Sequence, residues 1–88
     1  MATWIRANGT RTQTEPENGK TFSLSEMQKY VGGYVEQVLV PNTERVFLVN
    51  EEGLLLDLPD NEIATGLCGR RIVGDVLICN FDQMSLKL

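Results

Sequence analysis

The sequence predicts a small α+β domain: a mostly antiparallel sheet of about five strands, with a two-turn helix on one face and a second short helix at one end. Three observations predict this class. A chain of 88 residues has the length of one domain. Asn8-Gly9 is a strong β-hairpin signal. Two segments that begin with helix-capping residues separate the strand-like segments, which gives the order β-β-α-β-β-α-β.

The N-terminal part of the chain is expected to form a hairpin. Residues 3–7 are rich in β-branched and aromatic side chains, and residues 10–14 alternate as the returning strand. Asn8-Gly9 supplies the turn, because both positions tolerate a positive φ. The single domain, residues 1–88, is then divided into this hairpin at 1–20, an α+β core at 21–80 and a weakly ordered tail at 81–88.

The first helix is predicted to start after Ser23, a favourable N-cap that Glu26 completes as a capping box. Gly32-Gly33 ends this helix, because glycine adopts the left-handed conformation at a helix C-terminus. The alternative for these glycines is a site at which bare backbone lets a ligand approach closely. The apolar face that we expect to pack inward consists of Leu24, Met27, Tyr30 and Val31.

A second hairpin is predicted from the strands at 34–40 and 45–50, with a turn between them at 41–44. The strand Arg45–Asn50 is strongly apolar, and a small sheet has a free edge, so we expect this strand to promote self-association. After the turn at Glu51-Glu52-Gly53, a short extended piece is expected at Leu54–Leu56.

The second helix is predicted to begin at Asp60 as its N-cap and to close at Gly69. Its buried side is expected to consist of Ile63, Ala64 and Leu67. The final strand is predicted over Arg70–Cys79, with a kink or bulge at Gly74-Asp75.

Composition and charge exclude several classes of function. The chain has no histidine, which removes histidine-based catalysis and the usual zinc sites, and we expect no cofactor and no metal. The net charge is −4, and it lies in residues 50–88, which carry seven acidic and three basic residues. Binding of duplex nucleic acid is therefore not expected. No signal peptide or membrane-spanning run is present, so the expected location is the cytoplasm, with Cys68 and Cys79 reduced.

The stretch from Leu24 to Cys79 resembles an uncharacterised domain-of-unknown-function family common in phages, plasmids and conjugative elements of bacteria. The resemblance rests on four pieces: Val31-Gly32-Gly33-Tyr34-Val35-Glu36, Val49-Asn50-Glu51-Glu52-Gly53, Leu58-Pro59-Asp60-Asn61 with Ala64-Thr65, and Ile72-Val73-Gly74-Asp75-Val76. Where family members often carry basic residues after the third piece, this chain has Glu62-Ile63. The resemblance implies a small accessory protein of a mobile element, in the cytoplasm of its bacterial host; it implies no reaction.

The candidate ligand-binding residues are Arg70, Arg71, Tyr34, Asn50 and Asn61. Arg70-Arg71 is the only adjacent basic pair, and arginine suits phosphate or carboxylate; the alternative is that the pair only solubilises a strand. Tyr34, like Trp4 and Tyr30, can stack on a ligand or pack in the core. Asn50 and Asn61 also read as turn and cap residues. The five acids between Glu51 and Glu62 are either a cation or partner site or a solvated edge.

Three hypotheses remain open from the sequence. The first is a non-enzymatic binding protein that counteracts a host defence or regulatory system by sequestering a small anionic, nucleotide-like ligand, or else by binding a host protein directly. The second is a structural or assembly module that acts through homo-oligomer contacts. The third is an enzyme, which the absence of histidine and of a nucleophile motif disfavours. A pocket lined by arginine and aromatic groups would favour the small ligand, and an exposed apolar patch would favour a protein.

Overall fold

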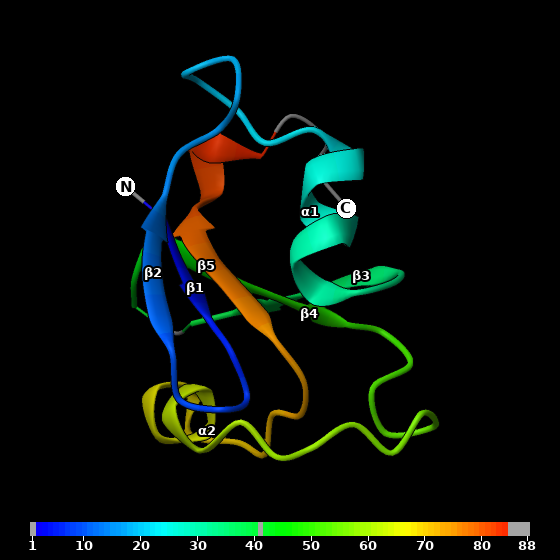
Figure 1. The fold of residues 1–88 in the computed structure, drawn as a ribbon. Helices are drawn as coiled ribbons and strands as arrows, with labels where there is room; N and C mark the ends of the chain where they lie inside the picture. The colour runs from blue at the N-terminus through cyan, green and yellow to red at the C-terminus, as the bar shows by residue number, and fades with distance from the viewer. Residues whose placement is uncertain (1, 41, 85–88) are drawn as a thin grey trace.

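The computed structural model describes residues 2–40 and 42–84. The elements, in chain order, are β1 (Ala2–Ile5), β2 (Arg11–Thr14), α1 (Leu24–Val31), β3 (Val35–Leu39), β4 (Arg45–Asn50), α2 (Glu62–Cys68), β5 (Val76–Asn80) and a 3-10 turn, η1 (Phe81–Gln83). The predicted α+β class and the order β-β-α-β-β-α-β are therefore confirmed (Figure 1).

All five strands form one antiparallel sheet in the order β2-β1-β5-β4-β3. The last strand in sequence, β5, lies at the centre, where Leu77 is opposite both Trp4 of β1 and Leu48 of β4. The N-terminal hairpin β1–β2 is thus part of the same sheet as the rest of the chain. β4 is an interior strand, so the expectation that Arg45–Asn50 forms the free edge is wrong; the edges are β2 and β3.

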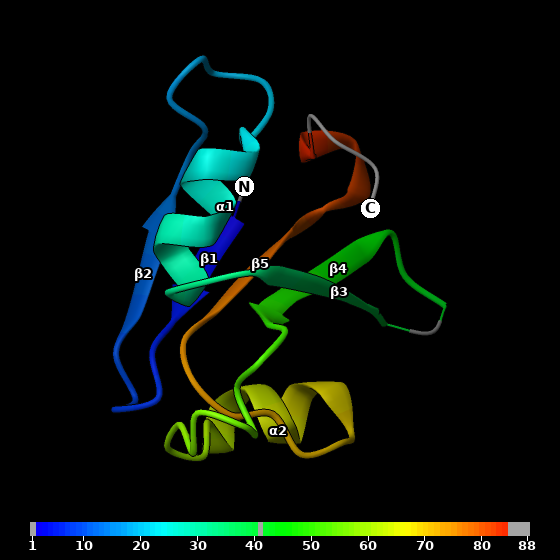
Figure 2. The ribbon, with the colours of Figure 1, turned by 90° about the vertical axis from the view of Figure 1, so that its right-hand side faces the viewer.

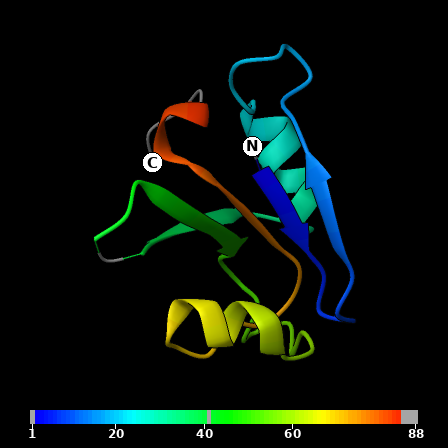
Figure 3. The same cartoon turned by 90° about the vertical axis from the view of Figure 1, so that its left-hand side faces the viewer.

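Both faces of the central strands are buried, which explains why β4 between Val46 and Val49 and β5 between Val76 and Cys79 are apolar without alternation. Alternate side chains point to opposite faces of a strand. On one face, α1 packs its buried Met27 and Val31 over side chains that include Leu48 and Leu77. On the other, Phe47 and Ile78 belong to a second cluster that includes Ala64 of α2. Figures 2 and 3 show α1 beside the sheet and α2 beneath one end of it, as expected.

The first helix follows its predicted signals. Ser23 is the N-cap, Glu26 completes the capping box, and Gly32 ends the helix with a φ of 78°. Of the predicted inward face, Met27 and Val31 are buried and Tyr30 is half-buried against the core, whereas Leu24 is exposed. Leu24 occupies the first turn, at the margin of the buried face.

The second helix begins one residue later than predicted, because Asn61 and not Asp60 is its N-cap. Asp60 instead lies outside the helix and pairs with Arg71. Gly69 closes the helix as predicted, with a φ of 83°. Of the predicted buried side, Ala64 is buried and Ile63 packs half-buried against the same cluster, but the prediction is wrong for Leu67, which is exposed.

Two further segments differ from the sequence prediction. Leu54–Leu56 forms successive turns and not an extended piece. The final strand begins at Val76 and not at Arg70, because Gly74, at a φ of 77°, breaks the strand geometry before it. Of residues 81–84, expected as the start of a tail, 81–83 form η1, and Met84 after it is buried against the α1 side of the core. Residues 85–88 of that expected tail lie outside the described residues.

Candidate functional site

The candidate site is a groove between the loop after β4 and the segment before β5. We call Leu54–Leu56 the leucine loop. Leu54 and Leu55 line the groove together with Arg70 and Arg71. The carboxylate-bearing residues Glu36 and Glu51 also line it. The fold thus brings the predicted arginine pair next to apolar side chains that the sequence analysis did not single out as a site.

The leucine loop exposes its side chains although its backbone is well bonded. Leu54, Leu55 and Leu56 are 71%, 85% and 56% exposed. The Leu56 amide donates to the Glu52 carbonyl at 2.9 Å, and the Leu58 amide donates to the Gly53 carbonyl at 3.0 Å. These bonds close successive turns, so the three leucines are held outward on a defined backbone.

The base of this loop is fixed by close packing at Gly53. A Cβ atom there would lie 2.8 Å from Cγ2 of Val73 and 3.3 Å from the Asn50 carbonyl oxygen. Only glycine therefore allows the loop to approach the 70–75 segment this closely. The same approach places the leucines beside the arginines.

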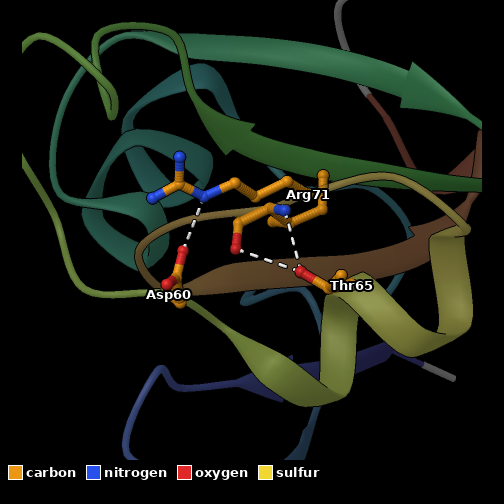
Figure 4. Close-up of polar contacts among 4 residues, drawn as sticks. Asp60, Thr65 and Arg71 are labelled. Atoms are coloured by element: carbon orange, nitrogen blue, oxygen red, sulfur yellow. Dashed lines mark hydrogen bonds and ion pairs between the residues drawn. The ribbon is translucent and has the colours of Figure 1, made fainter.

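Arg71 is held by a carboxylate while part of its guanidinium stays available. Its Nε donates to Oδ1 of Asp60 at 2.8 Å, and both side chains are largely exposed (Figure 4). An exposed pair of this kind contributes about 1 kcal/mol or less to folding. The bond uses Nε, and the two terminal nitrogens form no ion pair among the described residues. Those nitrogens are the part of the side chain that can bind an anion in a bidentate manner.

The backbone next to Arg71 is positioned by Thr65 of α2. The Ile72 amide donates to the Thr65 hydroxyl oxygen at 2.9 Å, and the Thr65 hydroxyl lies 3.3 Å from the Ile72 carbonyl (Figure 4). The Ile72 carbonyl also accepts from the Asn61 amide at 2.9 Å. These bonds connect the arginine pair to the helix rather than to a continuous strand.

Tyr34 lies apart from the arginine groove. Its side chain is 63% exposed and lines a neighbouring groove with Gly32, Gly33 and Leu56. The leucine loop therefore separates the two predicted candidates, with Leu54 and Leu55 facing the arginines and Leu56 facing Tyr34. The other two polar-tipped aromatics belong to the α1 side of the core, where the Trp4 indole N–H donates to the Tyr30 carbonyl at 3.0 Å.

Asn50 and Asn61 are buried, and their side-chain amides bond within the fold. Asn50 donates to the Val31 carbonyl at 3.2 Å and accepts from the Glu52 amide at 2.8 Å. Asn61 donates to the Ile5 and Gly74 carbonyls, both at 2.9 Å, and accepts from the Ala64 amide at 3.0 Å. The turn and cap roles considered from the sequence account for the bonds that the two side chains accept, and the bonds that they donate join them to distant segments of the fold.

The acids between Glu51 and Glu62 lie around the leucine loop. All are exposed except Glu52, which is half-buried. Within residues 2–40 and 42–84, no three of the acidic and cysteine side chains are grouped so as to hold a metal ion. The same ranges contain no helix long and apolar enough to cross a bilayer.

The family comparison covers nearly the whole sequence. Residues 5–86 match the family described as Domain of unknown function (DUF3846). The chain belongs to the DUF3846 family. No curated protein and no solved structure matches it.

Membership confirms the resemblance to a domain-of-unknown-function family, and the geometry of this DUF3846 domain adds what the sequence reasoning missed. The sequence predicted a site at the arginines, Tyr34 and the two asparagines, and only a short extended piece at Leu54–Leu56. The sequence signal that could have indicated this loop is the position of three consecutive leucines between turn residues at Gly53 and Pro59. A loop of this kind has no partner strand, so its apolar side chains have no part of the sheet to cover.

Proposed function

We propose that this DUF3846 domain is a non-enzymatic accessory protein that binds a partner protein through the leucine loop. The supporting observation is the exposure of three consecutive leucines, 71%, 85% and 56%, on a backbone fixed by hydrogen bonds. A contiguous exposed apolar patch on an ordered element is typical of a protein-interaction site. Ordered backbone also lowers the entropy that binding must overcome.

The charges around the loop favour one kind of partner surface. Glu51 and Asp57 flank the leucines in sequence and are exposed. The partner is therefore proposed to offer an apolar cleft with lysine or arginine side chains where it meets Glu51 and Asp57 and with a carboxylate where it meets Arg70, because complementary charges speed encounter and disfavour other partners. In the mobile-element setting that the resemblance implies, this partner is a protein of the host defence or regulatory machinery.

A second candidate function is the capture of a small anionic, nucleotide-like ligand at Arg70-Arg71. One observation favours it: Arg71 bonds Asp60 through Nε, which leaves its terminal nitrogens able to bind an anion. A phosphate held by both arginines gains charge-assisted hydrogen bonds. Glu36 and Glu51 in the same groove oppose an anion, and Tyr34 lies in the neighbouring groove, so we rank this function second.

The test compares matched leucine substitutions. Leu55→Asp changes the most exposed leucine of the loop, and Leu67→Asp changes a leucine on α2 that is 56% exposed. Tagged wild type and variants are expressed in a bacterial host, and the complexes are isolated and identified by native mass spectrometry. We expect a stoichiometric partner that Leu55→Asp loses and Leu67→Asp retains. A partner retained by Leu55→Asp would contradict the proposal.

The anionic ligand is tested separately by calorimetry with cyclic and linear nucleotides. Binding in the micromolar range that Arg70→Ala/Arg71→Ala weakens about tenfold or more would support the second candidate. No binding by the wild-type protein would remove it. Because Leu55→Asp leaves both arginines in place, the two functions give different patterns across the same variants.

A further inference from the structure

We propose that β3 pairs with β3 of a second copy, antiparallel and about a two-fold axis, so that two domains form one continuous sheet. This surface is separate from the leucine loop, and the inference goes beyond the proposed function. β3 is the last strand of the sheet and pairs with β4 alone. A strand edge of this kind presents unpaired backbone groups to any chain that can pair with it.

The direction of these backbone groups follows from the β3–β4 hydrogen bonds. The Glu51 amide donates to the Tyr34 carbonyl at 2.8 Å, and the Val40 amide donates to the Arg45 carbonyl at 3.4 Å. In an antiparallel pair the residues bonded to the partner strand alternate with residues whose N–H and C=O point away. The even-numbered residues therefore bond β4, and Val35, Gln37 and Leu39 direct their backbone groups outward.

This spacing selects one register for the dimer. When Gln37 lies opposite Gln37 of the second copy, Val35 lies opposite Leu39 on both sides of the axis, and all five residues of β3 are paired. In the neighbouring register, Val35 would lie opposite Gln37 and Glu36 directly opposite Glu36. Like charges in that position are destabilising. The centred register pairs Glu36 with Val38 instead.

Side chains on the α1 side of the sheet fit the centred register. Leu39 is 62% exposed, whereas Val35 is half-buried against the α1 side of the core. Pairing covers each Leu39 with a Val35, so the apolar core of each domain continues across the axis. Cross-strand apolar pairs of this kind stabilise antiparallel sheets.

Gln37 supplies an independent reason. Its Oε1 atom is buried and accepts no hydrogen bond, and it is the only such side-chain atom within residues 2–40 and 42–84. A buried acceptor without a donor is costly, and folded proteins rarely keep one. At the centre of the proposed pair, a rotation of the amide group lets the two Gln37 side chains bond each other.

The other edge of the sheet shows what a protected edge looks like in this chain. β2 has the sequence Arg-Thr-Gln-Thr, with polar side chains throughout and only four residues. β3 has the sequence Val-Glu-Gln-Val-Leu, so three of its five side chains are apolar, and apolar edge strands without a blocking residue invite pairing. The contrast assigns pairing to β3.

An interface formed by one short strand is small, and small interfaces give weak association. The test is therefore sedimentation velocity of the complete protein over a wide range, from about 5 to about 500 µM. We expect wild type to pass from monomer to dimer within that range. Leu39→Lys puts a charge opposite Val35 and is expected to weaken dimerisation at least tenfold. Leu55→Lys makes the same change on the leucine loop and is expected to leave it unchanged.

A second variant tests the hydrogen-bonding direction. Gln37→Pro removes an N–H that points away from β4, so the fold is expected to survive, as checked by thermal unfolding, while the central pair is lost. Wild type that stays monomeric to the highest concentration would overturn the proposal. So would a dimer that persists in both Leu39→Lys and Gln37→Pro, or one that only Leu55→Lys abolishes. Because Leu39→Lys spares the leucine loop, a failed dimer and a failed protein-binding function are distinguishable.

Discussion

The side-chain amide of Asn61 donates to the backbone carbonyl of Ile5 at 2.9 Å, across 56 positions of sequence. Through this bond the start of α2 is attached to the end of β1. The same nitrogen donates to the Gly74 carbonyl at 2.9 Å, and Oδ1 caps the helix at the Ala64 amide. One buried side chain therefore joins three segments that the sequence keeps apart.

Replacing Asn61 with alanine is expected to destabilise the domain by about 3 kcal/mol. A lost N-cap costs about 1 kcal/mol, and each buried carbonyl left without a donor costs about 1–3 kcal/mol. The free energy of unfolding is measured by urea denaturation. Asn18→Ala is the control, because the Asn18 bonds to the Lys20 and Thr21 amides and to the Thr21 hydroxyl are all exposed, so the change should cost less than about 1 kcal/mol. Equal losses in the two variants would contradict the joining role of Asn61.

The two glycines after α1 are predicted to matter for different reasons. Gly32 has a φ of 78° with open space around it, so Gly32→Ala should cost about 1 kcal/mol through backbone strain alone. Gly33→Val should cost more, because a Cβ there lies 3.0 Å from Nδ2 of Asn50 and displaces its bond to Val31.

Gly66 provides the matched control for this pair. It lies within α2 with nothing near its would-be Cβ, so Gly66→Ala should raise stability by about 0.5–1 kcal/mol through helix propensity. Thermal unfolding of the three variants gives the comparison. If Gly32→Ala were as stable as wild type, the left-handed helix stop would not be what this glycine provides.

Glu26 is predicted to make stability fall at acid pH. Its Oε1 accepts from the Ser23 amide at 2.9 Å and its Oε2 accepts from the Glu17 amide at 3.0 Å. The backbone hydrogen bond from Ser23, followed by that from Glu17, holds the pKa of the Glu26 carboxyl below its ordinary value of 4.5. A lowered folded-state pKa stabilises the protein above pH 4.5, and this contribution disappears as the pH falls through the lowered value.

Denaturation series at several pH values check this prediction. Glu26→Gln should be less stable than wild type at neutral pH, and the difference should shrink as wild-type Glu26 becomes protonated. Glu17→Gln should behave as wild type, because only the backbone amide of Glu17 takes part in this contact. A pH-independent difference between wild type and Glu26→Gln would show that the charge of Glu26 is not what stabilises the helix start.

Local signals predicted the elements that depend on neighbouring residues. The capping box at Ser23 and Glu26, the glycine stop at Gly32 and the apolar strand Arg45–Asn50 all appear where the sequence placed them. The N-cap of α2 did not, because Asp60 and Asn61 are both good caps. The choice depends on the Ile5 and Gly74 carbonyls, which need a donor, and an aspartate carboxylate has none.

The candidate site was less predictable for the same reason. The arginine pair could be found from composition, but its neighbours Leu54 and Leu55 come from a turn whose path depends on the packing of Gly53 against Val73. An apolar triplet predicts burial in general, since burial is the usual state of leucine. The exposure of these leucines can be predicted only when it is known that other strands complete the sheet. The open edge at β3 likewise follows from the sheet order.

The position of β5 at the centre of the sheet has a consequence for how the protein is made. The hairpins β1–β2 and β3–β4 are each local in sequence, yet only β5 joins them. On the ribosome, both hairpins are synthesised while the strand between them is still missing. β1 and β4 then present apolar edges until residues 76–80 leave the exit tunnel, and unpaired edges of this kind favour aggregation. Completion of the fold therefore waits for residues 76–80, and release before β5 leaves two halves that have no shared sheet.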